Sequence, residues 1–266
     1  MLRDVLGKTV FDQRRSLLGW SVALVLLVAM YVAIWPSVRD QPSMSDFLDQ
    51  MPEAFRSLFA ASGADLSTGA GYVQVELLSL MGPIIVLVYA VGAGASAVAG
   101  EEERHTMDAL LANPVSRARV VLEKAAALVL GTLLLAAVLA VALVAEGRLV
   151  DMGLPTGHVA AAMQHLALLG IVFGTLALAV SATSGSLGLS RAVPVVVAVV
   201  AYVVNGLAPM VGWLEPLQKV SPFYQYIGHD PLRRGVALDS VGVAVVTSVL
   251  LATVAVWGFR RRDVTG

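Results

Sequence analysis

The sequence has no cysteine and few charged residues. Of its 266 residues only 14% are Asp, Glu, Lys or Arg, whereas a soluble domain of this length is about 25% charged. The absence of cysteine excludes a disulfide framework and thiolate chemistry. The low charge, with a hydrophobic fraction of 58% and a mean hydropathy of +0.80, indicates that most of the chain lies in lipid.

A nucleotide-binding loop is also missing. The one Gly-Lys-Thr sequence is Gly7-Lys8-Thr9, and a phosphate-binding loop requires another glycine five residues before Gly7, where Leu2 stands. The sequence contains no soluble α/β domain that could hold such a loop. We therefore do not expect this chain to hydrolyse nucleotide.

Long apolar runs dominate what is present. A membrane-spanning helix needs about 20 mainly apolar residues, and the qualifying segments are approximately 17–35, 77–99, 125–145, 160–182, 192–211 and 240–259. Gly and Ala are frequent inside them, as expected where helix backbones pack closely within a membrane. We predict an all-α integral membrane protein in which residues 1–266 form one transmembrane domain with six transmembrane helices.

The basic residues indicate the orientation of these helices. With both termini in the cytoplasm, 12 of the 18 lysine and arginine residues lie on the inner side, as the positive-inside rule requires. This inner set is Arg3, Lys8, Arg14, Arg15, Arg104, Arg117, Arg119, Lys124, Arg191, Arg260, Arg261 and Arg262. An even number of spans agrees with both termini lying on one side.

Three segments outside the spans have features of their own. Residues 2–16 carry apolar residues on one helical face and are expected to form a cytoplasmic interfacial helix. Residues 46–60 have helical apolar spacing and predict a short amphipathic helix on the outer face. Residues 212–239 are rich in proline and aromatic residues, which favours short pieces at the membrane boundary that could dip back into the outer leaflet.

The most informative segment is a charged break between the second and third spans. Glu101, Glu102 and Glu103 precede a narrow apolar stripe at helical spacing, formed by Met107, Leu110 and Leu111. Asn113-Pro114 is typical of a helix cap followed by a first turn, so we expect a surface helix that ends near Ala112 and a new helix that begins at Pro114. This pattern alone fits a docking surface and a solvated loop about equally well.

The surrounding sequence resembles the membrane subunit of ATP-binding-cassette exporters, and more narrowly the bacterial type-two permeases. The resemblance covers the whole chain, but its specific part is Tyr89-Ala90-Val91-Gly92-Ala93-Gly94, Ala99-Gly100-Glu101-Glu102-Glu103-Arg104, Leu110-Leu111-Ala112-Asn113-Pro114-Val115-Ser116-Arg117 and Val121-Leu122-Glu123-Lys124. Ser221-Pro222-Phe223-Tyr224 before the last span also fits, and in that family this region is a re-entrant external hairpin.

This resemblance implies a function and partners. Residues 101–112 would be the coupling helix that docks on a separate ATPase subunit, with Glu101, Glu102, Glu103, Arg104, Met107, Leu110, Leu111, Asn113 and Pro114 as coupling residues. ATP and magnesium would bind on that ATPase, and this chain would hold no cofactor or metal. Two permeases, identical or paralogous, would form the pathway in the bacterial inner membrane with two ATPases. The cargo would be a hydrophobic or amphipathic compound, and membrane lipid, but no nucleic acid, would be a partner.

Small residues and prolines inside the spans indicate packing and bending. Gly170 and Gly174 lie four residues apart and allow close helix approach. Gly82-Pro83 and Pro194 free backbone carbonyls and should kink their helices. Such kinks would serve as hinges or as static bends, and the sequence does not separate the two.

Two other classes of function remain to be weighed. A non-transporting scaffold or sensor that works with an ATPase fits the same sequence. An intramembrane hydrolase could use Glu101, Glu102 and His165, but His-Glu-x-x-His is absent and the glutamates should be cytoplasmic while His165 should lie toward the outside. We therefore expect no catalytic residue, and the sequence names no substrate-binding residue.

Overall fold

A computed structural model describes residues 5–39, 50, 52, 53, 55, 65–112 and 114–262. All regular secondary structure within these residues is helical. The helices long and apolar enough to cross a membrane are α1 (Val5–Arg39), the second span (Gly69–Ser96), α8 (Arg117–Leu149), α9 (Thr156–Ser184), α10 with its extension (Leu187–Met210) and α14 (Leu238–Arg261). The prediction of an all-α fold with six transmembrane helices is confirmed.

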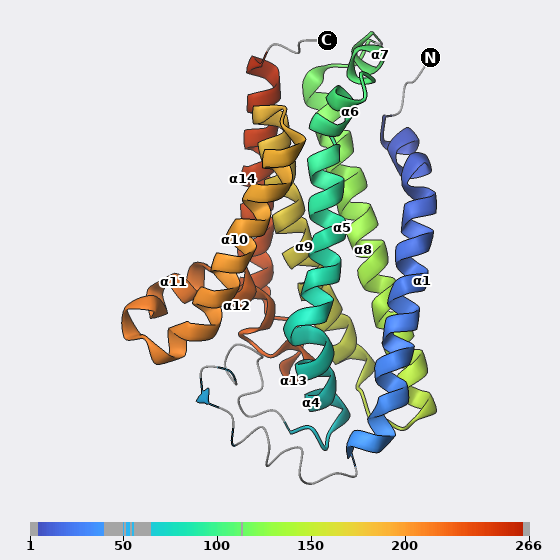
Figure 1. Cartoon of the computed structure of the whole chain (residues 1–266), viewed down its shortest axis with the longest axis vertical. Helices are drawn as coiled ribbons and strands as arrows, with labels where there is room; N and C mark the ends of the chain where they lie inside the picture. The colour runs from blue at the N-terminus through green and yellow to red at the C-terminus, as the bar shows by residue number, and fades with distance from the viewer. Residues whose placement is uncertain are drawn as a thin grey trace.

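The spans form an elongated bundle with both chain termini at the same end (Figure 1). We call this the terminal end. It also carries the short helices α6 (Ala99–Glu103) and α7 (Met107–Leu111). We call the opposite end, with α4 (Gly69–Val73) and α13 (Pro231–Arg234), the distal end. Six crossings place the two termini together, as the sequence predicts.

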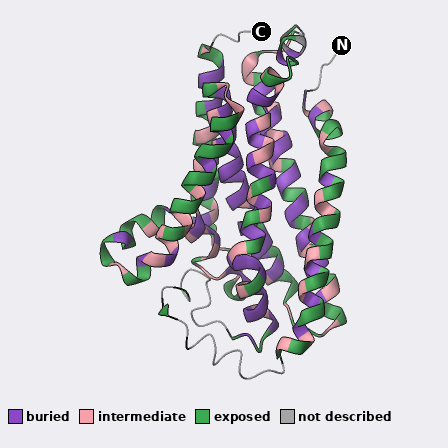
Figure 2. Cartoon of the chain, viewed as in Figure 1, coloured by how far each residue is buried: buried purple, intermediate pink, exposed green. Residues whose placement is uncertain are grey.

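The helix α9 is the centre of the bundle, and α10 lies at its edge. Most residues of α9 are buried against α5, α8, α10 and α14, whereas in α10 the buried residues are Ser190, Pro194 and Gly206 (Figure 2). The helix α9 lies close against α5 (Gly82–Ser96). A Cβ atom on Gly94 would lie 2.1 Å from the carbonyl oxygen of Gly174, so both positions need glycine for this crossing.

The second span is built from three pieces, because its helical geometry changes before Gly82. A π-helix, η1 (Gln74–Met81), joins α4 to α5. In π-helical register the proline at position 83, which has no N–H, leaves the carbonyl of Leu78 without a helical donor. The hydroxyl of Tyr226 donates a hydrogen bond to this carbonyl at 2.9 Å. The bend predicted at Gly82-Pro83 is therefore a change of helix type that a second segment compensates.

The segment between α10 and α14 folds back toward the middle of the bundle. Its helices are η2 (Ala208–Met210), η3 (Gly212–Leu214), α11 (Glu215–Val220), α12 (Pro222–Ile227) and α13. The ring of Phe223 lies 6.0 Å from that of Phe173, which is about 25 Å along α9 from Thr156. The hydroxyl of Ser221 donates to the carbonyl of Ala201 in α10 at 3.0 Å. This depth is what a re-entrant hairpin over 212–239 requires.

Two boundary predictions differ from the structure. Residues 5–16 are helical, as expected for the segment 2–16, but they continue into the first span, because α1 runs without a break from Val5 to Arg39. The second span begins at Gly69 rather than 77, since Thr68 caps α4 by accepting a hydrogen bond from the N–H of Gly71. The amphipathic helix expected over 46–60 falls almost entirely outside the described residues.

Candidate docking site at the terminal end

The charged break forms two short helices rather than one. His105 has a positive φ of 56°, a conformation that ends a right-handed helix, and it separates α6 from α7. The N–H of Thr106 donates to the carbonyl of Glu101 at 2.9 Å and closes the turn. The single helix expected over 101–112 is therefore wrong, although α7 ends at Leu111, next to the predicted end.

Glu101 is bound inside the protein. Its carboxylate lies 2.6 Å from Nζ of Lys124 in α8, and the two side chains are only 16% and 8% exposed. Burial by itself raises the pKa of Glu101, but hydrogen bonds from Lys124 and Thr106 and the charges of Lys124 and Lys8 outweigh it. The pKa therefore lies below its ordinary value, and Glu101 is ionised at neutral pH.

Glu102 forms a second inward ion pair. Its carboxylate binds the guanidinium of Arg262 at the end of α14. Arg117, at the start of α8, donates to the carbonyl of Phe259 in α14 at 3.2 Å. We call Glu101, Glu102, Lys124, Arg262 and Arg117 the terminal clamp, because together they join α6, α8 and α14.

The first helix is attached to the same region. The N–H of Leu6, in the first turn of α1, donates to the carboxylate of Glu123 in α8 at 2.9 Å. A carboxylate at this position also interacts favourably with the positive end of the helix dipole. Three of the six spans, α1, α8 and α14, thus meet in polar contacts beneath α6 and α7.

The apolar stripe of α7 also faces inward. Met107 is 1% and Leu110 is 4% exposed, and both belong to a buried cluster with residues of α1, α8, α9 and α14 and with the turn that follows α5. The side chain of Leu111 lies outside the described residues. The stripe therefore anchors α7 to its own bundle and does not present apolar surface.

The opposite side of α6 and α7 is exposed and charged. Glu103, His105 and Asp108 are exposed there, and we call these three residues the outward face. Arg104 is also exposed, but its side chain lines a cavity on the bundle side. The outward face thus carries two carboxylates at the extreme terminal end of the molecule (Figure 1). Such a surface, held by buried contacts on its other side, is suited to recognising a charged partner.

Residues 2–260 match the family described as the C-terminal domain of the multidrug efflux system permease Rv1217c. The chain belongs to this family of multidrug efflux permeases. No curated protein matches the sequence. The match includes all six spans and the helices α6 and α7, so the bundle and its candidate docking site are both parts of the permease.

The connection from α7 to α8 in this permease differs from the sequence prediction. The structure begins α8 at Arg117, with Ser116 as its cap: Oγ of Ser116 accepts a hydrogen bond from the N–H of Arg119 at 3.2 Å. The helix expected to begin at Pro114 is therefore wrong, because the cap is Ser116, three residues after the expected cap at Asn113. Pro114 is exposed, and Asn113 lies outside the described residues.

The residues singled out for packing lie where helices touch. A Cβ on Gly170 would lie 2.6 Å from the side chain of Val86, and one on Gly174 would lie 3.0 Å from the carbonyl of Ala90. Both glycines therefore permit α9 to lie against α5. Pro194 is buried within α10, which continues through it as one helix.

The residues of the hydrolase hypothesis lie far apart. Glu101 and Glu102 are in the terminal clamp, whereas His165 is bound to the segment after α10. One ring nitrogen of His165 pairs with the carbonyl of Gln225 at 3.1 Å, and the other accepts from the N–H of Ala237 at 3.2 Å. The permease thus uses His165 to hold its folded-back segment.

Proposed function

We propose that this chain is the permease subunit of an ATP-driven exporter, coupled to a separate ATPase through α6 and α7. The terminal end faces the cytoplasm of a bacterium and the chain lies in its inner membrane. Two permeases, as identical copies or paralogues, enclose the pathway, while ATP and magnesium bind on the ATPase. The observation that carries this proposal is the charged outward face backed by the terminal clamp.

The coupling argument rests on what lies behind the outward face. A partner that pushes on α7 acts on a helix whose other side is packed by Met107 and Leu110. The ion pairs of Glu101 and Glu102 pass the displacement to α8 and α14. These contacts favour a tilt of whole helices, which is the rigid-body type of transition that alternates access in transporters.

The pairing of two permeases is supported by an acidic side chain on the surface of the second span. Glu76 lies within the second span and is exposed in the single chain. Ionisable side chains within spans normally face protein or a water-filled cavity rather than lipid. A pathway between two permeases would supply such surroundings. The cargo is a hydrophobic or amphipathic compound, as the family's description as multidrug efflux permeases suggests.

The test is co-purification of the ATPase with matched charge reversals. Asp108→Lys changes the outward face, whereas Asp239→Lys makes the same change at the exposed start of α14. Glu101 and Glu102 are unsuitable, because reversing them would break the terminal clamp. Reversal at Asp108 should weaken ATPase retention about tenfold, as expected for a charged interface contact, and Asp239→Lys should retain it.

Three results would separate the alternatives. Loss of the ATPase in Asp108→Lys alone supports docking at the outward face. Retention in both variants contradicts it. An ATPase that is retained but hydrolyses ATP at the same rate with and without candidate cargo would favour the scaffold or sensor function.

A further inference from the structure

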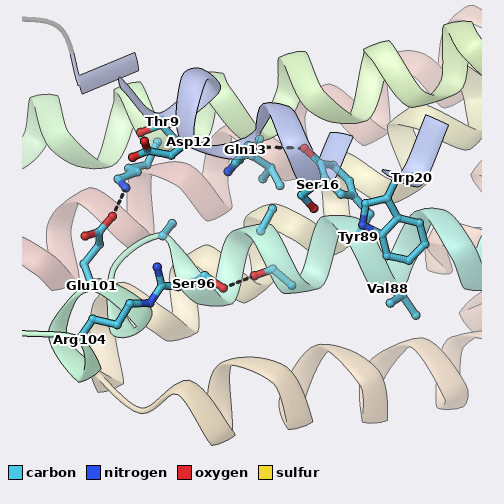
Figure 3. A pocket seen from close by; sticks show the side chains of 15 residues that line it. Thr9, Asp12, Gln13, Ser16, Trp20, Val88, Tyr89, Ser96, Glu101 and Arg104 are labelled. Carbon is cyan, nitrogen blue, oxygen red and sulfur yellow. Dashed lines mark hydrogen bonds and ion pairs between the residues drawn. The ribbon is translucent and has the colours of Figure 1, made fainter. Parts of the chain in front are cut away.

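A polar cavity of about 400 Å³ lies between α1, α5, α6 and α8 in the terminal half of the bundle (Figure 3). The helix α1 packs along α8. It meets α5 through an edge-to-face contact of Trp20 with Tyr89, at 6.4 Å between ring centroids, and a hydrogen bond from Tyr89 to Gln13. These contacts form one end of the cavity. Its volume is within the range of about 300–1,000 Å³ that small-molecule sites occupy.

Four charged side chains line the cavity, and two of them neutralise each other. Glu101 and Lys124 form the ion pair of the terminal clamp. Asp12 lines the wall formed by α1, and Arg104 lines the opposite wall formed by α6 (Figure 3). Within the part of the chain that the structure describes, neither Asp12 nor Arg104 has a hydrogen-bond or ion-pair partner. The cavity therefore offers one negative and one positive group on facing walls.

The lining becomes apolar away from the terminal end. Trp20 lies about 12 Å further along α1 than Asp12, and Val88 lines the same part of the cavity (Figure 3). Polar residues surround the end near α6, including Thr9 and Ser96. A ligand that matches this gradient has a charged head at the terminal end and an apolar body beside Trp20.

We infer that this cavity binds a zwitterionic amphiphile, whose ammonium group pairs with Asp12 and whose anionic group pairs with Arg104. A ligand with a single charge would leave one of these side chains without a partner and would bind less tightly. Binding does not depend on the proposed function, but a role of this ligand as cargo does rest on it.

Glycine 92 provides a way to fill the cavity without a clash. It lines the cavity, and a Cβ at this position would meet nothing within 4 Å. Gly92→Leu therefore places a side chain in the ligand's space. Gly19 in α1 also has nothing within 4 Å but does not line the cavity. Gly19→Leu is thus a matched control for the effect of the substitution on helix stability and insertion.

The experiment measures quenching of tryptophan fluorescence by spin-labelled amphiphiles in nanodiscs that contain this chain alone. Because the chain has four tryptophans, the contribution of Trp20 is the part of the quenching that is lost in Trp20→Phe. The probes are phosphatidylethanolamine, phosphatidylglycerol and an alkyltrimethylammonium, each with a doxyl group on its chain. We expect saturable quenching by the zwitterionic phosphatidylethanolamine that disappears in Trp20→Phe. Gly92→Leu should weaken it about tenfold, because the leucine side chain occupies part of the ligand's space, and Gly19→Leu should leave it unchanged.

Charge variants test the head-group assignment. Asp12→Asn should shift the preference toward the anionic phosphatidylglycerol, and Arg104→Gln toward the alkyltrimethylammonium. If a water-soluble alkyl sulfobetaine displaces the probe, the site also accepts zwitterionic ligands from the cytoplasm. If the probe quenches but is not displaced, the ligand is membrane phospholipid. Equal quenching by all three probes, or no effect of Gly92→Leu, would overturn the inference. Because no ATPase is present, this result is independent of the docking test.

Discussion

The two ends of the bundle are held together by different chemistry. At the terminal end, α6, α8 and α14 are joined by ion pairs, such as that of Glu101 and Lys124. At the distal side, neutral groups bind backbone carbonyls: Tyr226 donates to Leu78 and Ser221 donates to Ala201. Ion pairs thus join α6 to α8 and α14 at the terminal end, and uncharged hydrogen bonds are used where the folded-back segment enters the bundle.

This difference follows from the cost of placing polar groups in lipid. A charge within the hydrocarbon region is expensive, whereas a hydroxyl that satisfies a carbonyl lowers the cost of a broken helix. Ion pairs near the boundary are stronger and more directional than neutral hydrogen bonds. The contacts at the terminal end therefore join whole helices through charge, and the distal contacts hold a segment in place.

The largest effect should come from removing one partner of the buried ion pair. Lys124→Met leaves Glu101 buried without its cation, which should lower the free energy of unfolding by about 3 kcal/mol. Lys219→Met makes the same change in a pair with Glu215 that is 4.0 Å long and about two-thirds exposed, and it should cost less than about 0.5 kcal/mol. Denaturant titration in detergent measures both. Equal losses of free energy of unfolding in the two variants would contradict the larger contribution predicted for the buried pair.

A smaller loss is expected at the distal side. Tyr226→Phe removes the hydroxyl that satisfies the carbonyl of Leu78, and an unsatisfied buried carbonyl costs about 1–2 kcal/mol. Tyr224→Phe is the control, because its ring packs on His229 and its hydroxyl has no hydrogen bond among the described residues. Thermal unfolding of the two variants provides the comparison, and a Tyr226→Phe variant as stable as the wild type would refute the role of this bond.

Removing the cap of α8 should lower the stability by as much as Tyr226→Phe does, or by less. Ser116→Ala should destabilise the protein by about 1 kcal/mol, because the N–H of Arg119 loses its acceptor. Asn113→Ala should have little effect, since α8 begins four residues later. The same unfolding measurements compare the two positions. A larger loss of stability in Asn113→Ala than in Ser116→Ala would support Asn113 as the cap.

The smallest effect should come from mild acid. The pKa of Glu101 is held below its ordinary value of 4.5, so its contribution to stability is fully present above that value and is lost as the pH falls through the lower, folded value. The melting temperature should be flat above pH 6 and fall below about pH 4.5. In Glu101→Gln this acid-dependent decline should be shallower. An unchanged slope would show that other groups cause it.

The sequence predicted the spans well, because hydrophobic length is a local property. Six apolar runs were enough to identify six helices, and the spacing of Gly170 and Gly174 was enough to predict close helix packing. The bend at Gly82-Pro83 was also foreseeable, since proline lacks an N–H. Its form as a π-helix was not, because the compensating donor, Tyr226, is 148 residues away.

The candidate site was predicted in location but not in orientation. Helical spacing groups Met107 with Leu110, but it does not tell whether that face meets the same chain or a partner. The partner of Glu102 is Arg262, 160 residues later, and no local pattern joins them. The turn at His105 was missed because a positive φ at a residue other than glycine has no reliable sequence signal.

The most direct measurement is photo-crosslinking from the outward face. Since the chain has no cysteine, Asp108→Cys and Asp239→Cys each carry one thiol that can be labelled with benzophenone maleimide. The account predicts that light joins Asp108→Cys, but not Asp239→Cys, to an ATPase subunit in native membranes, and that the yield changes with added ATP. Labelled Asp108→Cys that crosslinks to lipid alone, while the ATPase is captured from Asp239→Cys, would contradict coupling through α6 and α7.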